Sequence, residues 1–246
     1  MSALLKAELL KLRTTRTFFA LTGSALALSL VVLLLVTLLG DNFSERDVRA
    51  AFALDFTGLF ITLLGAMGMA GEWRHKTITS AVLAAPNRLK LIAAKTISYA
   101  IAGIVVSLIV TVSIMLVGTI ILSVRGETTL DAATLFDILW RNLVVAAYFG
   151  AFGVVVGAVV RNQIAAIIGL LLFPFTLEVA LFALVPDVAK FSPIGGAPSG
   201  IVNVTFGDDN NANTYLDPGP AALVMIAWVS VLFAAGATLL RRRDLT

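Results

Sequence analysis

The sequence lacks cysteine entirely and has a single histidine among its 246 residues. Without cysteine the chain can form neither a disulfide framework nor a thiolate metal site. One histidine likewise excludes a site that needs several imidazole ligands from the same chain. Charge is also scarce, because 13% of the residues are charged whereas 59% are hydrophobic. This composition is too apolar for an ordinary soluble domain and is typical of a membrane protein.

Long runs with few or no charges recur along the chain. A helix needs about 20 apolar residues to cross roughly 30 Å of hydrocarbon. We therefore predict an all-α integral membrane protein with six transmembrane helices, which form a single transmembrane domain over residues 1–246 with no soluble domain. We also predict a short charged turn at residues 41–49, an interfacial helix within residues 123–142 and a polar loop over residues 186–220. The predicted spans are residues 18–39, 50–70, 97–122, 143–160, 164–185 and 221–240.

The first 17 residues carry four basic side chains against one acidic side chain, Glu8. Leu5, Leu9 and Leu12 would share one face of a helix in this segment. We predict an amphipathic helix that lies in the membrane interface ahead of the first span. The alternative is a basic tail whose charge only orients the protein. The basic residues are Lys6, Lys11, Arg13 and Arg16.

Lysine and arginine are distributed unevenly among the segments outside the predicted spans. If the N-terminus lies inside, thirteen of the 18 are cytoplasmic and five are external. Cytoplasmic segments of membrane proteins carry such an excess. We therefore predict that both termini are cytoplasmic and that residues 186–220 lie outside. The five external basic residues are Arg46, Arg49, Arg125, Arg141 and Lys190.

The motifs of nucleotide-hydrolysing and intramembrane enzymes are absent. The sequence has no G-x-x-x-x-G-K-[ST] phosphate loop and no H-E-x-x-H zinc motif. His75 and every lysine lie outside the predicted spans, so a serine within the membrane has no basic partner for a catalytic dyad. We therefore expect no catalytic, cofactor-binding or metal-binding residue. The energy for any uphill transport would come from another chain or from an ion gradient.

Two acidic residues lie within predicted spans. Glu178 is deep in the fifth span, four residues after Pro174, which is expected to kink the helix. A charge at the bilayer centre costs roughly 3 kcal/mol on insertion scales. Glu178 is therefore expected to pack among helices or line a lumen, with a proton-relay role as the alternative. Asp55 is expected to be solvated near the outer end of the second span.

The fourth span carries three glycines, Gly150, Gly153 and Gly157, and the last two have G-x-x-x-G spacing. Small residues let two helices approach closely within lipid. We predict that these glycines are helix-packing positions. The neighbouring helix belongs either to the same chain or to a second subunit.

The segment from Gly71 to Lys95 separates the second and third predicted spans and holds six of the chain's charged residues. Within it, Thr77 to Ala85 could form two turns of helix before Pro86, which cannot continue a helix. Helical spacing would place four apolar residues on one face. A short amphipathic helix on a basic side of the membrane typically docks against protein, although lipid alone could also cover it. The apolar residues are Ile78, Ala81, Val82 and Ala85.

The same segment resembles the cytoplasmic loop of type-2 ATP-binding-cassette (ABC) transporter permeases. The resemblance rests on Glu72-x-Arg74-x-x-Thr77, on Leu83-x-x-Pro86-x-Arg88 and on Lys95. The sequence departs from the family at Lys76, where a glycine is frequent. The resemblance extends over most of the chain, because five features occur in the family's order. They are the basic N-terminal helix, the six spans, the loop after the second span, the short turn between spans four and five, and the outer loop before span six.

The resemblance implies an exporter subunit that works as a dimer, homomeric or heteromeric, in a bacterial cytoplasmic membrane. Each subunit would contact lipid and an ABC-type ATPase, which would bind ATP and Mg²⁺. The substrate would be a drug, peptide, lipid or similar molecule. The alternatives are a non-transporting anchor, immunity or regulatory subunit, and a gradient-driven carrier. The residues implied to couple the loop to the ATPase are Glu72, Arg74, Thr77, Ile78, Ala81, Val82, Pro86 and Arg88.

Overall fold

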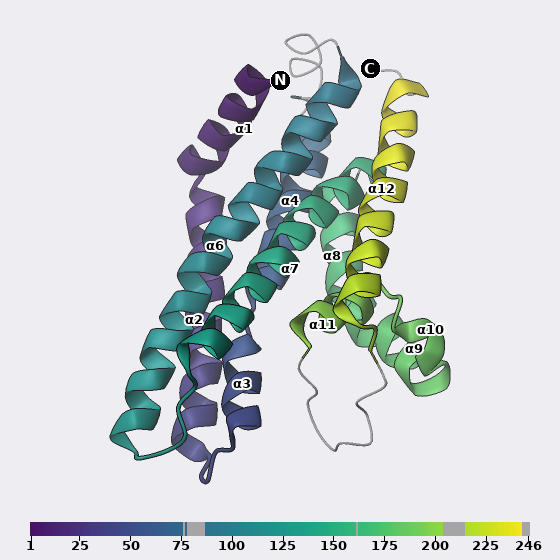
Figure 1. Cartoon of the computed structure of the whole chain (residues 1–246). Coiled ribbons are helices and arrows are strands. Elements are labelled where there is room, and N and C mark those ends of the chain that lie inside the picture. Colours follow the sequence, from purple (N-terminus) through teal and green to yellow (C-terminus); the bar gives the residue numbers. More distant parts are fainter. Residues whose placement is uncertain (76, 78–86, 161, 204–214, 243–246) are drawn as a thin grey trace.

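A computed structural model of the chain describes residues 1–75, 77, 87–160, 162–203 and 215–242 (Figure 1). Among these residues every regular element is helical, which confirms the predicted all-α architecture. Six helical stretches are long and apolar enough to cross a membrane, as predicted. They are Arg16–Leu39, Glu45–Arg74, Arg88–Val124, Ala132–Val159, Gln163–Leu184 and Pro218–Leu240.

The first and the last described helix of the chain reach the same end of the helical bundle. In Figure 1, helix α1 (Ser2–Thr14), the last turns of α12 (Pro218–Arg242) and the beginning of α6 (Arg88–Val124) all lie at this end. We call this the terminal end of the bundle and the opposite one the far end. The basic N-terminal segment predicted as an amphipathic helix is therefore helical, and α2 (Arg16–Leu39) follows it after one residue.

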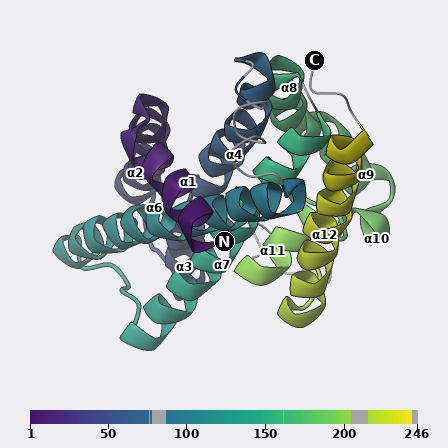
Figure 2. The ribbon, with the colours of Figure 1, turned by 90° about the horizontal axis from the view of Figure 1, so that it is seen from above.

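Three helices form the centre of the bundle: α4 (Thr57–Arg74), α6 and α7 (Ala132–Val159) pack against one another. Helix α2 packs against α4 and α6 on one side, whereas α8 (Gln163–Phe173) packs against α4 and α12 against α7. Figure 2 shows α1 and α2 on one side of the molecule and α8, α9 and α12 on the other. The outer helices leave large apolar side chains exposed, such as Leu35 and Leu172, which is the pattern of a surface that faces lipid.

Glycines bring the central helices into close contact. A methyl group on Gly150 would overlap the carbonyl oxygen of Tyr99 in α6, and one on Gly153 would overlap that of Thr62 in α4. A methyl group on Gly157 would stand 2.7 Å from the carbonyl oxygen of Ala66. All three predicted glycines thus lie against helices of the same chain. The absence of a side chain lets the α7 backbone approach two neighbours at once.

The second span begins earlier than predicted and is broken. Residues 45–49, predicted as a turn, form the start of α3 (Glu45–Ala53), because Ser44 and Asp47 make a capping box at its first turn. Residues 54–56 then separate α3 from α4. The helix predicted within residues 123–142, leading into the next span, is present as the first part of a longer helix. Most of it belongs to α7, which runs unbroken from its N-cap Asp131.

The fifth span changes its winding at the predicted kink. Pro174 begins a π-helical segment, η1 (Pro174–Glu178), between α8 and α9 (Val179–Leu184). Proline lacks the N–H that would continue the ladder of α8, so this is the place where a regular helix is weakest. The predicted polar loop then contains two short helices, α10 (Pro186–Ala189) and α11 (Gly196–Val202).

Candidate functional site

The segment predicted to dock against a partner connects α4 to α6, and the end of α4 and the start of α6 both lie at the terminal end. Helix α4 ends at Arg74, and α6 begins after Asn87, whose side-chain oxygen accepts a hydrogen bond from the Lys90 N–H at 3.2 Å. Apart from Thr77, the predicted helix from Thr77 to Ala85 lies outside the described residues. So do four of the predicted coupling residues, Ile78, Ala81, Val82 and Pro86.

The other four predicted coupling residues are described, and they differ in exposure. Glu72 is buried in the last turn of α4, whereas Arg74 and Thr77 are exposed. The Thr77 N–H donates to the Glu72 carbonyl oxygen at 2.9 Å, so the chain folds back as it leaves α4. Arg88 donates to the carbonyl oxygen of Leu240, which joins the start of α6 to the end of α12.

Glu72 belongs to a cluster of four alternating charges that joins α1, α4 and α6. The Lys95 ammonium lies 2.7 Å from a carboxylate oxygen of Glu8 and 2.9 Å from one of Glu72. Lys11 reaches the same Glu72 oxygen at 2.7 Å. The Lys95 side chain is fully buried and that of Glu72 is 4% exposed, whereas Lys11 is half exposed. We call these four residues the ion-pair cluster.

The ion-pair cluster joins helix α1 to the end of α4 and to the first turns of α6, the two helices that flank the predicted docking segment. Its two acids and two bases balance, so no net charge is buried. A buried charge is tolerated only where partners and hydrogen bonds replace its hydration. Sequence reasoning named Glu72 but missed the partnership of Glu8 with Lys95, which are 87 residues apart. A signal existed, because Glu8 is the only acid in a basic amphipathic helix and Lys95 is the last charge before an apolar run.

Asp55 lies in the break between α3 and α4, and its predicted solvated position near the outer end of the span is wrong. One carboxylate oxygen accepts hydrogen bonds from the hydroxyls of Ser107 at 2.7 Å and Thr111 at 2.9 Å. These two residues are in the middle of α6. The other oxygen accepts from the Thr57 N–H at 2.7 Å, where α4 begins. Asp55 therefore anchors the broken span to the centre of α6.

Glu178 is buried at the end of η1 and faces the backbone that joins α10 to α11. One of its oxygens accepts a hydrogen bond from the Ile194 N–H at 2.9 Å. The other lies 2.9 Å from where a methyl group on Gly195 would stand, so a side chain there would be crowded. Tyr148 in α7 donates to the neighbouring Pro193 carbonyl oxygen at 2.8 Å. Glu178 and Tyr148 thus fix the same short segment.

The comparisons with known proteins bear on the whole arrangement. The family model described as ABC-2 family transporter protein matches residues 4–178. This range includes most of α1, the ion-pair cluster, the segment between α4 and α6, and all of η1. The chain belongs to the ABC-2 transporter family. No curated protein matches the chain. ABC-2 permeases are the membrane component of their transporters, without a catalytic site of their own, and they associate with an ABC ATPase.

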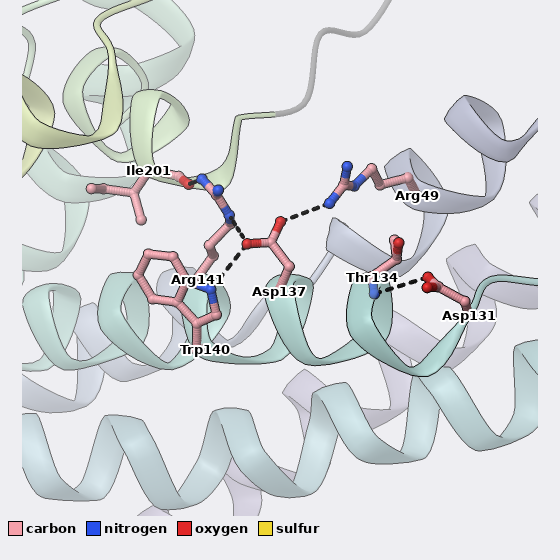
Figure 3. A network of polar contacts seen from close by, with 7 residues as sticks. All are labelled: Arg49, Asp131, Thr134, Asp137, Trp140, Arg141 and Ile201. Carbon is pink, nitrogen blue, oxygen red and sulfur yellow. Dashed lines mark hydrogen bonds and ion pairs between the residues drawn. The ribbon is translucent and has the colours of Figure 1, made fainter.

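The far end of this ABC-2 permease has its own polar network (Figure 3). Asp137 in α7 accepts from Arg49 of α3 at 2.6 Å and from Arg141 at 2.9 Å, and Arg141 also donates to the Ile201 carbonyl oxygen of α11 at 2.8 Å. Helices α3, α7 and α11 are therefore joined at this end. Asp131 caps α7, and its hydrogen bonds with Thr134 lower the pKa of the carboxyl group.

The position of Glu178 in the permease leads to a testable expectation. Glu178→Gln keeps an acceptor for the Ile194 N–H, so we expect stability and ATP hydrolysis with a partner ATPase to remain largely intact. Glu178→Leu leaves that N–H unpaired in a buried place and should lower the free energy of unfolding by about 1–3 kcal/mol. Thermal unfolding in detergent would compare the two variants. Complete loss of ATP hydrolysis in a well-expressed Gln variant would instead indicate a charge-dependent step.

Proposed function

We propose that this chain is the membrane-spanning permease subunit of an ATP-driven ABC exporter. A separate ATPase subunit would bind ATP and Mg²⁺, and the complex would move a drug, peptide, lipid or similar substrate out of the cell. The observation that carries the proposal is the family match, which extends over four of the six candidate spans, most of the fifth and the segment between α4 and α6.

The segment between α4 and α6 is the proposed contact with the ATPase. Its amphipathic pattern offers an apolar face at Ile78, Ala81 and Val82, flanked by the charged side chains of Arg74 and Arg88. The ion-pair cluster supports this role, because it brings Glu72 and Lys95 to 2.9 Å at the two ends of the segment. A contact element with fixed ends transmits a push to α4 and α6 together, whereas an element on loose ends would absorb it.

We further infer that two permease subunits, identical or different, assemble in a bacterial cytoplasmic membrane with both termini inside. The exposed apolar side chains of α2 and of the α8–α9 stretch would contact lipid or the second subunit. The excess of lysine and arginine at the terminal end supports the orientation. The outer helices bury little of their surface within one chain, and this supports the need for further contacts.

Reconstitution with a candidate ABC ATPase tests the proposed function. The two proteins should co-purify, and substrate movement in proteoliposomes should require ATP and stop when the phosphate-loop lysine of the ATPase is replaced. Movement that persists without the ATPase but collapses with the proton gradient would identify a secondary carrier. Binding of the substrate without ATP-dependent movement would identify a sequestering or anchoring subunit.

The orientation can be tested by cysteine labelling, because the natural chain contains no cysteine that would react. Ser2 at the start of α1 and Asp187 in α10 are both exposed. Helix α1 lies at the terminal end, whereas α10 lies away from that end, near the first turns of α12 (Figure 1). In intact cells, Asp187→Cys should react with a membrane-impermeant maleimide, and Ser2→Cys should react only after the membrane is opened. The reverse pattern would contradict the predicted topology and the proposed ATPase contact.

A further inference from the structure

A cavity of about 350 Å³ opens beside the ion-pair cluster, between α1, α2, α4, α6 and α8. Leu12, Leu64 and Met67 contribute apolar walls, whereas Lys11, Glu72 and Gln163 contribute polar groups. Thr15 and Thr17, also in the lining, stand at the first turn of α2, where the apolar span begins. The cavity therefore lies where the first span begins, which is the level expected for lipid headgroups.

Two oxygen atoms in the lining are buried without a hydrogen-bond donor among the described residues: Oε2 of Glu72 and Oε1 of Gln163. Both side chains belong to residues less than 10% exposed, at 4% for Glu72 and 9% for Gln163. The Gln163 oxygen lies 3.8 Å from where a methyl group on Gly71 would stand, and so beside the turn of α4 that carries Glu72. Buried acceptors are nearly always paired in native proteins, so these two atoms call for a donor that the described residues do not supply.

The chemistry of the lining selects the kind of donor. Glu72 uses its other oxygen for Lys95 and Lys11, and the free one presents the charge of a carboxylate. A primary ammonium group has three N–H donors and no acceptor, so it carries enough donors for both oxygens. A quaternary ammonium has no N–H and cannot. Lys11 is half exposed beside the carboxylate and can pair with a phosphate.

We propose that the cavity binds the headgroup of a phospholipid with a primary amine, such as phosphatidylethanolamine, from the leaflet at the terminal end. The ammonium group would donate to Glu72 and Gln163, the phosphate would pair with Lys11, and the glycerol and acyl chains would lie along Leu64 and Met67. The bound lipid would link α8 to α4, the helix that carries Glu72 of the ion-pair cluster. The proposal requires membrane insertion but not ATP-driven transport.

Lipids that differ only in methylation of the amine provide the test. The full-length protein is placed in nanodiscs containing equal amounts of phosphatidylethanolamine, its monomethyl and dimethyl forms and phosphatidylcholine, all with the same acyl chains. Native mass spectrometry then counts the lipids retained. We expect retention to fall with each methyl group, by about tenfold from the primary amine to phosphatidylcholine. Gln163→Met keeps the size of the side chain without the oxygen and should weaken this preference several-fold.

Matched controls separate this site from general lipid adhesion. Ser230→Ala changes a second, more apolar cavity between α7 and α12 and should keep the preference unchanged. Equal retention of all four lipids by the natural protein would overturn the proposal, as would an unchanged preference in Gln163→Met. If soluble phosphoethanolamine stabilises the protein in phosphatidylcholine discs as strongly as the lipid does, the site takes free amines and the assignment to lipid is overturned.

Discussion

Replacing Lys95 with methionine should lower the free energy of unfolding by about 3–5 kcal/mol, the usual cost of removing one partner from a buried ion pair. Methionine retains the apolar stem of lysine, so little packing is lost. The acids Glu8 and Glu72, which lie 2.7 and 2.9 Å from the ammonium, would then face each other across the vacated space. Lys11 could compensate only one of them, since its bond is to Glu72.

Release of helix α1 from the bundle should make the Lys95→Met variant recognisable by its sensitivity to trypsin. Glu8 joins α1 to α6, so its loss of a partner should expose the basic residues of α1 to trypsin well before the rest of the protein unfolds. The double variant Lys95→Met/Glu8→Leu removes one charge of each sign and leaves the Glu72–Lys11 pair. It should recover most of the stability. If the double variant is as unstable as the single one, packing and not charge balance explains the defect.

An ion pair on the protein surface provides the matched control for the Lys95→Met experiment. Lys190 and Asp187 form an ion pair at 3.2 Å in which Asp187 is 93% exposed. Exposed pairs contribute about 0–1 kcal/mol. Lys190→Met should therefore leave both the thermal midpoint and the trypsin pattern nearly unchanged. A loss as large as that of Lys95→Met would show that burial does not set the cost in this protein.

Val82→Asp should abolish association with the ATPase. If Val82 lies on the apolar face of the proposed coupling helix, the new carboxylate would be desolvated in the interface without a partner. That would cost at least about 3 kcal/mol, which is roughly a hundredfold in affinity. The helices of the bundle would be untouched, so insertion and thermal stability should be retained. Co-purification and the stimulation of ATP hydrolysis should be lost together.

Ser80→Asp is the control for that experiment. In a helix, residue 80 would point about 200° away from residue 82, so the same charge would face water. This variant should bind the ATPase normally. Loss of binding in both variants would indicate a general effect of negative charge on the segment, and retention in Val82→Asp would show that Val82 does not contact the ATPase.

Which helices cross the membrane could be predicted because the length of an apolar run is a local property of the sequence. Partners across helices could not be predicted in this way. Residues 54–56 contain neither proline nor glycine to mark the break between α3 and α4, so Asp55 was assigned to the wrong depth. Its hydroxyl partners, Ser107 and Thr111, lie more than fifty positions later in the chain.

In the candidate site too, features that depend on neighbouring residues could be predicted from the sequence, whereas contacts between distant residues could not. Glu72 could be selected from its place at the end of an apolar run. Lys95 was assigned to the boundary of the third span, but α6 begins at Arg88, and its first turns carry Lys95 into the packed interior beside Glu8. A charge beside an apolar run is compatible with exposure or with burial, and only the approach of another helix decides between them.

The uninterrupted length of α6 has a mechanical consequence. No proline occurs from Arg88 to Val124, so the helix behaves as a stiff rod. At Gly103 it touches the backbone of Ala146 so closely that a methyl group would not fit. This contact stands about 22 Å from the Arg88 end and about 32 Å from the Val124 end, at 1.5 Å per residue. Because the rod is stiff, a sideways push at Arg88 would be carried along the helix toward Val124 and would not be absorbed by a bend between them.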